Sequence, residues 1–194
     1  SVRDLPEADL IVAADGVNSG VRAERASAFR PRVRAGRCRF IWLGTTLKLD
    51  AFTFVFRETE HGVFAVHAYP FEKEPRGLGT WIVECHEDTW RRAGLEHVQE
   101  EEACSVFEKL FADRLGGARL LNNKSIWRTF PEVVCETWRD GNVVLLGDAA
   151  HTAHFSIGSG TKLAMEDAIA LRDAFLLRGL GDVPGALAAY EDAR

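Results

Sequence analysis

The chain has 194 residues, of which 46% are hydrophobic and 27% charged, enough for one substantial hydrophobic core or two small ones. Its net charge of −5 and pI near 5.7 argue against nucleic acid or a membrane surface as a partner. No apolar run approaches the roughly 18 residues of a membrane span, and the polar first residues do not resemble a signal peptide.

The first predicted element is a strand over residues 10–14. Its apolar run shows no alternation, which is typical of a strand that is covered on both faces. A turn is expected at Asp15-Gly16, followed by a short helix or turn over residues 19–25. The next stretch, RPRVRAGRCRF, is basic and irregular, and we interpret it as a connection.

The middle of the chain, from about residue 38 to 85, consists of aromatic and β-branched segments separated by turn residues. This pattern predicts an antiparallel sheet of about four strands, with a hairpin at Glu60-His61-Gly62. Two helices are expected next, over EDTWRRAGL and QEEEACSVFEKLFADRL, and Gly116-Gly117 ends the second. One or two extended segments then lead back to an apolar stretch.

That stretch, residues 143–146, predicts a second buried strand, followed by a helix from about Gly160 to Leu177 and another that begins near Pro184. The ends of the chain are therefore α/β in character. We predict an α/β domain formed by residues 1–34 and 136–194. Residues 35–135 are expected to form a β-rich α+β domain with a mostly antiparallel sheet.

Gly147-Asp148 directly follows the second buried strand. Ligands bind at the carboxyl ends of strands in open α/β sheets, where an ionised aspartate accepts a hydrogen bond from a donor such as a ribose hydroxyl. Gly158 and Gly160 would let the backbone approach a ligand at a helix start. The alternative is that Asp148 caps a turn and the glycines serve the geometry of the loop.

The stretch ADGVNSGVR follows the first buried strand and forms a second motif. Asp15-Gly16 is followed three and six residues later by Ser19 and Arg22. On its own this pattern fits a turn with a helix cap. The pattern points to a ligand site only because it occurs together with Gly147-Asp148.

Together the two motifs resemble those of the class A flavoprotein aromatic hydroxylases, the para-hydroxybenzoate hydroxylase type. In that family the aspartate matched by Asp148 binds the ribityl or ribose region of FAD, and glycines beyond it bring backbone amides to the isoalloxazine. The motif matched by Asp15-Gly16 bears on the pyrophosphate and on NAD(P)H use. The resemblance implies that the α/β domain is a partial FAD-binding domain, with these cofactor-binding residues: Asp15, Gly16, Arg22, Gly147, Asp148, Gly158 and Gly160.

Within the family, GDAAHTAHFSIGSGTKLAMEDAIAL and the segment from FIWLGTT to HAYPF are most similar to monooxygenases of aryl-CoA thioesters, the salicylyl-CoA 5-hydroxylase and 2-aminobenzoyl-CoA monooxygenase types. The resemblance implies an FAD-dependent enzyme that takes electrons from NADH or NADPH. It would hydroxylate an aromatic ring, carried as a CoA thioester, through a flavin C4a-hydroperoxide. It also implies that the β-rich domain binds the substrate.

Candidate substrate residues are His67 and Tyr69, which share one face of a predicted strand. The aromatic side chains of the sheet suit an aromatic ring, but a plain hydrophobic core explains most of them. The arginines of the basic connection either meet CoA phosphates or form a solvated surface: Arg30, Arg32, Arg34, Arg37 and Arg39. We expect no metal site, because no set of ligands has suitable spacing.

The chain departs from the family in lacking an amino-terminal GxGxxG; Gly77-Leu78-Gly79 does not replace it. We therefore expect an internal fragment of a longer enzyme, inactive alone, that binds FAD weakly or not at all. It also has His154-Phe155 where many members have Pro-Pro, and Lys162 where they have Asn.

The four cysteines are scattered, which favours reduced thiols in a cytoplasmic protein. The open alternatives for function are a flavin-dependent reductase or halogenase on the same scaffold, or a non-catalytic module that binds a small molecule. The sequence does not indicate an oligomeric state.

Overall fold

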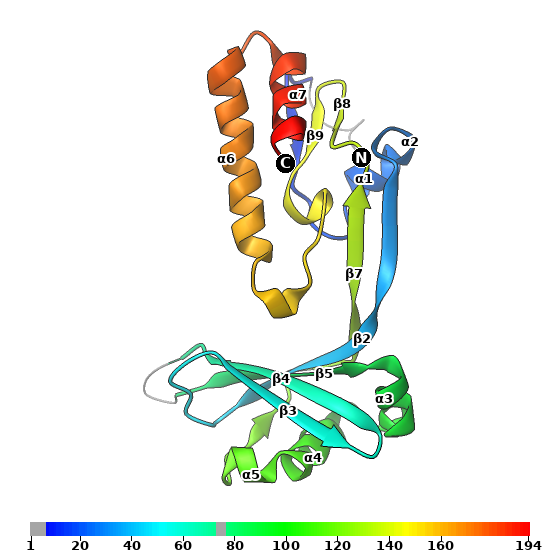
Figure 1. The fold of residues 1–194 in the computed structure, drawn as a ribbon, viewed down its shortest axis with the longest axis vertical. Helices are drawn as coiled ribbons and strands as arrows, with labels where there is room; N and C mark the ends of the chain where they lie inside the picture. Colours follow the sequence, from blue (N-terminus) through cyan, green and yellow to red (C-terminus); the bar gives the residue numbers. More distant parts are fainter. Residues whose placement is uncertain (1–6, 73–76) are drawn as a thin grey trace. The chain divides into compact units, whose positions relative to one another are not determined.

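The computed structural model describes residues 7–72 and 77–194, which belong to two compact units (Figure 1). The terminal unit consists of Ser1–Ala35 and Pro131–Arg194, and the central unit of Gly36–Phe130. The chain passes from one unit to the other within two strands, β2 (Pro31–Thr45) and β7 (Arg128–Cys135), which pair with each other.

The terminal unit contains a three-stranded sheet in the order β1-β9-β8, in which β1 and β9 are parallel and β8 is antiparallel to β9. A parallel pair needs a long crossover connection, and here the connection includes the whole central unit. The elements of this unit are β1 (Ile11–Ala13), α1 (Gly20–Glu24), α2 (Ala26–Phe29), β8 (Arg139–Asp140), β9 (Val143–Leu145), η3 (Gly147–Ala149), η4 (Phe155–Ile157), α6 (Gly160–Arg178) and α7 (Val183–Ala193).

Strand β9 is buried on both faces, which explains its uninterrupted apolar sequence. Val143 and Leu145 pack with Phe29 on one side, while Val144 packs on the other side with residues of α6 and α7 such as Leu187. The prediction for the other strand was only partly correct. In β1, Val12 is 42% exposed, so the described part of the unit covers one face of this strand only.

The central unit is built on a six-stranded sheet in which β3-β4-β5-β2-β6 are neighbours and β7 also pairs with β2. The pairs β3–β4, β4–β5, β2–β5 and β2–β6 are antiparallel, as expected, and Glu60-His61 forms the β3–β4 hairpin turn. The remaining elements are β3 (Thr53–Thr59), β4 (Gly62–Pro70), β5 (Gly79–His86), α3 (Glu87–Arg92), η2 (Leu95–His97), α4 (Glu100–Leu110), α5 (Ala112–Leu115) and β6 (Leu120–Leu121).

Helices α3, α4 and α5 lie against one face of this sheet (Figure 1). Alternate residues of the strands, such as Val66 in β4 and Trp81 in β5, pack there with Phe107 and Phe111. Because side chains alternate along a strand, the residues between them point to the opposite face. That face carries His67 and the exposed aromatic side chains described below.

Two local predictions were wrong. The basic stretch interpreted as an irregular connection belongs to β2, a strand whose backbone pairs with β7 and β5. Its arginines alternate with apolar residues, and Gly36 shifts that alternation by one residue. The second long helix is interrupted at Phe111, which separates α4 from α5. Its predicted end is confirmed, because Gly116 caps α5 in the left-handed conformation.

Candidate functional site

The carboxyl end of β9 leads into the Gly147-Asp148 turn. Gly147 has a φ of +62°, and a Cβ added there would lie 3.1 Å from the Cβ of Ala164 in α6. Glycine therefore allows both the left-handed backbone and the close packing on the helix. The Asp148 side chain is exposed, and its carboxylate has no hydrogen bond or ion pair to any residue in the described ranges. The turn thus presents a free acceptor at the end of a buried strand.

A buried carboxylate in α6 holds this turn in place. Asp167 has no exposed surface and accepts hydrogen bonds from the N–H of Gly147 at 2.9 Å and from Nε of Arg194 at 2.7 Å. Its Oδ2 also lies 2.9 Å from Nε2 of His151. The His151 ring stacks on Trp138, with centroids 4.6 Å apart. The backbone that carries Asp148 is therefore fixed from the helix.

The loop after this turn leaves the amino-terminal end of α6 open. Gly158 has a φ of +68°, and a Cβ added to Gly158 or Gly160 would meet no heavy atom within 4 Å. The N-cap residue, Ser159, makes no side-chain hydrogen bond to the helix. The first N–H groups of this 19-residue helix therefore have no side-chain cap, and an acceptor could approach them.

The Asp15-Gly16 turn has a different local structure. The Asp15 carboxylate accepts hydrogen bonds from the N–H groups of Gly20 at 2.8 Å and Val21 at 3.2 Å, while Ser19 accepts one from the N–H of Arg22. Partial burial opposes ionisation, but the hydrogen bonds from Ser19 and these N–H groups hold the pKa of Asp15 below its ordinary value. Asp15 and Ser19 therefore cap helix α1.

Arg22 joins the two motifs, which are more than a hundred residues apart in the sequence. Its side chain is buried and donates to the carbonyl oxygens of Val17 at 2.5 Å, Ala149 at 2.9 Å and Asp148 at 3.4 Å. Gly16, with a φ of +81°, begins the turn that carries Val17. The structure thus joins Arg22 to the carbonyls of Asp148 and Ala149, while Asp15 and Gly16 follow β1, the parallel neighbour of β9.

In the central unit, His67 and Tyr69 lie on the face of the sheet opposite the helices. Nε2 of His67 is 3.1 Å from Oε2 of Glu84 in β5, and both residues are buried, with 5% and 8% exposure. The ring of Phe54 meets His67 edge-on, with centroids 5.0 Å apart, and Phe52 stacks on Tyr69. A buried ionisable pair therefore lies among aromatic rings on this face.

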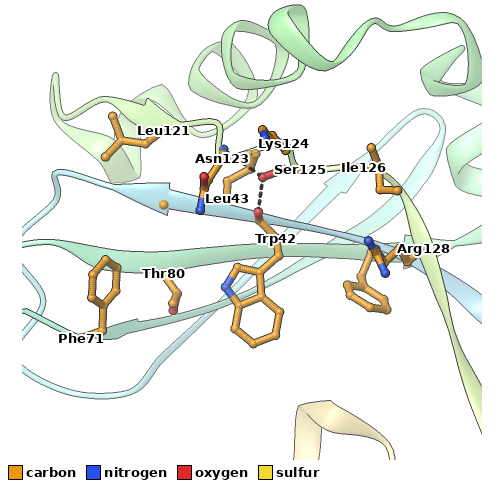
Figure 2. A pocket seen from close by; sticks show the side chains of 12 residues that line it. Trp42, Leu43, Phe71, Thr80, Leu121, Asn123, Lys124, Ser125, Ile126 and Arg128 are labelled. Atoms are coloured by element: carbon orange, nitrogen blue, oxygen red, sulfur yellow. Dashed lines mark hydrogen bonds between the residues drawn. The ribbon is translucent and has the colours of Figure 1, made fainter. Parts of the chain in front are cut away.

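A pocket of about 540 Å³ lies beside β2 of the same sheet (Figure 2). Figure 2 shows Trp42, Phe71 and Thr80 projecting from the same side of the sheet, with the segment from Leu121 to Ile126 running along β2. Ser125 ties this segment to the strand, because its hydroxyl donates to the carbonyl of Trp42. The pocket combines aromatic walls with polar and cationic side chains.

Sequence reasoning missed two of the residues that organise these surfaces. Glu84 is the one charged residue in the stretch GTWIVEC, and a charge in an otherwise apolar strand is a usable signal for a buried pair. Asp167 follows Glu166 in a helix of mixed character, and nothing local in the sequence separates the buried carboxylate from the half-buried one. Its role depends on contacts with residues far along the chain.

Two negative findings concern the described residues alone. No group of three or more His, Cys, Asp or Glu side chains within 7–72 and 77–194 is arranged to hold a metal ion. Over the same ranges, no helix has the length and apolar character needed to cross a membrane.

Comparison with known families gives a match over almost the whole chain. The sequence model of the FAD binding domain family matches residues 5–194. The chain belongs to this family. The predicted membership of a flavin-binding family is therefore confirmed, and so is the predicted fold class, an α/β domain with a mostly antiparallel substrate domain.

Two of the relatives that resemble this chain over nearly its whole length are named monooxygenases or hydroxylases. Salicyloyl-CoA 5-hydroxylase from a Streptomyces species is 45% identical over 199 residues, covering 98% of this chain and 38% of the relative. The second, 3-hydroxy-4-methyl-anthranilyl-(aryl-carrier protein) 5-monooxygenase from Streptosporangium sibiricum, is 44% identical and covers 98% of this chain and 49% of the relative. The chain thus spans less than half the length of both relatives.

A solved structure with the same fold is the tetrameric form of 2-methyl-3-hydroxypyridine-5-carboxylic acid oxygenase. It superimposes with a TM-score of 0.69 at 22% identity, covering 99% of this chain and 51% of that one. At this identity the likeness shows the fold. This chain therefore shares its fold with an oxygenase of known structure.

Proposed function

We propose that this chain is the central part of an FAD-dependent monooxygenase that uses NADH or NADPH to hydroxylate an aromatic substrate, carried as a CoA thioester. The observation that carries the proposal is the free Asp148 carboxylate at the end of β9, beside an open helix start, in a chain of the FAD binding domain family. The names of the two relatives support the aromatic thioester as the substrate class.

The donors and acceptors of this site fit a flavin nucleotide. Asp148 would accept from a hydroxyl of the ribityl or ribose region, the backbone around Gly158 and Gly160 leaves room for the flavin ring, and the α6 end would face its electron-rich edge. Gly147, with its positive φ, would hold Asp148 at the required angle. When bound, FAD supplies the redox chemistry that passes electrons to oxygen and one oxygen atom to the ring.

Asp15, Gly16 and Arg22 would complete the site in two ways. Asp15 and Gly16 shape the turn near the expected pyrophosphate. Arg22 would act as a positioning residue, because its guanidinium is already bound to the carbonyls of Val17, Asp148 and Ala149. In this proposal residues 1–34 and 136–194 form the partial FAD-binding domain.

Residues 35–135 would form the substrate-binding domain. The sheet face with Phe52, Phe54 and Tyr69 offers an apolar surface for an aromatic ring. His67, held by Glu84, would provide a polar contact to a ring substituent. The four free cysteines are consistent with a reducing compartment, and we infer that the protein acts in the cytoplasm.

The full-length protein provides the test. FAD titration should give stoichiometric binding, and NADH or NADPH oxidation should accelerate when an aryl-CoA thioester is added. FAD binding without stimulation by any aromatic acid or thioester would favour a non-catalytic binding module. Formation of a halogenated product in the presence of chloride or bromide would favour the halogenase alternative.

A further inference from the structure

The pocket beside β2 has aromatic walls that the proposed flavin site does not use. Trp42 and Phe71 line it, and both are large and exposed, at 47% and 60%. Phe40 lines it as well. With a volume of about 540 Å³, the pocket lies within the range of small-molecule sites. Its walls suit an apolar or planar group.

The charge of this pocket is opposite to that of the protein. Lys124 and Arg128 line it, and its lining within the described residues includes no carboxylate, although the chain has a net charge of −5. Both cations are exposed, and neither forms an ion pair or hydrogen bond to another residue in the described ranges. Two cations without acidic partners at one pocket predict an anionic ligand.

The turn that carries Lys124 is held in an unusual conformation. Lys124 has a φ of +53°, in the left-handed region of the backbone that residues other than glycine rarely adopt. Ser125 fixes the turn: its N–H donates to Oδ1 of Asn122 at 2.8 Å, and its hydroxyl donates to the carbonyl of Trp42. The sequence thus keeps a lysine at a turn position where glycine or asparagine would fit more easily, at the rim of the pocket.

We propose that this pocket binds the phosphorylated pantetheine arm of a thioester substrate, with Lys124 and Arg128 bound to its phosphate and the aromatic walls against the rest of the arm. The inference deepens the proposed function and rests on it. An aryl thioester has no carboxylate on its acyl carbon, so the phosphate of its carrier is the anion available for recognition. Both CoA and a carrier protein present this phosphopantetheine chemistry.

The test is calorimetric titration of the full-length protein with pantetheine, 4′-phosphopantetheine, dephospho-CoA and CoA. 4′-Phosphopantetheine should bind about tenfold more tightly than pantetheine, and the difference should shrink as salt is raised. If CoA binds more tightly still, free CoA is the source of the arm. Equal affinity for CoA and 4′-phosphopantetheine would point to a carrier protein.

Matched variants locate the effect in the pocket. Lys124→Gln and Arg128→Gln should each weaken 4′-phosphopantetheine binding about fivefold and leave pantetheine binding unchanged. Lys109→Gln, which removes an exposed lysine from helix α4 outside the pocket, should change neither. Full FAD content in each variant would show that the protein is folded.

Two results would overturn the inference. One is equal binding of pantetheine and 4′-phosphopantetheine by the unaltered protein. The other is a loss of benzoate binding in Lys124→Gln and Arg128→Gln with no loss for 4′-phosphopantetheine, which would assign the cations to a ring carboxylate. If these occur while the protein still binds FAD and oxidises NAD(P)H with an aromatic substrate, the proposed function stands and the pocket assignment alone fails.

Discussion

Asp15 and Asp148 are both exposed aspartates that follow a strand, yet their carboxylates are in different states. The Asp15 carboxylate accepts hydrogen bonds from two backbone N–H groups of α1. The Asp148 carboxylate has no hydrogen-bond or ion-pair partner among the residues that the structure describes. Asp15 therefore contributes to the fold, whereas the Asp148 carboxylate would be available to the proposed ligand, and the two should respond differently to mutation.

Asp148→Ala should lower FAD affinity about tenfold or more, because a hydrogen bond to a charged acceptor is lost. Its free energy of unfolding without FAD should stay within about 0.5 kcal/mol of the parent. Flavin fluorescence titration and chemical denaturation measure the two quantities. Asp192→Ala, which removes another exposed carboxylate of the terminal unit, is the control and should change neither.

Asp15→Ala should mainly lower the free energy of unfolding and have the smaller effect on FAD affinity. Loss of the cap should lower the free energy of unfolding by about 1 kcal/mol. Since the pKa of Asp15 is lowered in the folded protein, its contribution is present above the ordinary value of 3.8 and is lost as the pH falls through the folded value. Denaturation of parent and Asp15→Asn at pH 7 and pH 3 should show a difference that shrinks at pH 3. A constant difference would contradict this account.

At the scale of elements, the contact between α1 and the Gly147-Asp148 turn depends on one side chain. Arg22 satisfies three backbone carbonyls from a buried position, so Arg22→Met should lower the free energy of unfolding by about 3 kcal/mol. Arg22→Lys should recover little, since an ammonium cannot reproduce the planar set of donors. Arg32→Met, at an exposed arginine of β2, should be nearly neutral in denaturation experiments.

The glycines around α6 have different physical reasons, and alanine substitutions separate them. Gly147→Ala should destabilise the protein by about 2 kcal/mol, because of its positive φ and its contact with Ala164. Gly160 has neither constraint, so Gly160→Ala should leave stability unchanged or raise it by about 0.5 kcal/mol. If a flavin approaches this backbone, Gly160→Ala should still weaken FAD binding. Unchanged FAD affinity would argue against that approach.

At the scale of the whole molecule, the sequence was most informative where local pattern and environment agree. The β9 run, the Glu60-His61 hairpin and the Gly116 cap were predictable, since each depends on neighbouring residues. Strand β2 was not. Its arginines alternate with apolar residues, but Gly36 shifts that alternation by one residue, and the strand's pairing is with distant segments of the chain.

The candidate site follows the same rule. The sequence alone predicted that Asp148 follows the end of a buried strand and that Gly158 and Gly160 precede or begin a helix. The contacts of Arg22 with Ala149, and those of Asp167 with His151 and Gly147, could not, because they join segments that are far apart or that carry no local signal. Sequence reasoning therefore finds the residues proposed to face a ligand more readily than those that hold them in place.

The central claim is that this chain belongs to an enzyme that inserts oxygen into an aromatic ring. The most direct measurement is mass spectrometry of the product formed by the full-length protein with FAD, NADH or NADPH, salicyloyl-CoA or benzoyl-CoA, and ¹⁸O₂. The account predicts a hydroxylated thioester that carries one ¹⁸O atom. NAD(P)H oxidation that yields only hydrogen peroxide and unchanged thioester, for every aryl-CoA tested, would contradict it.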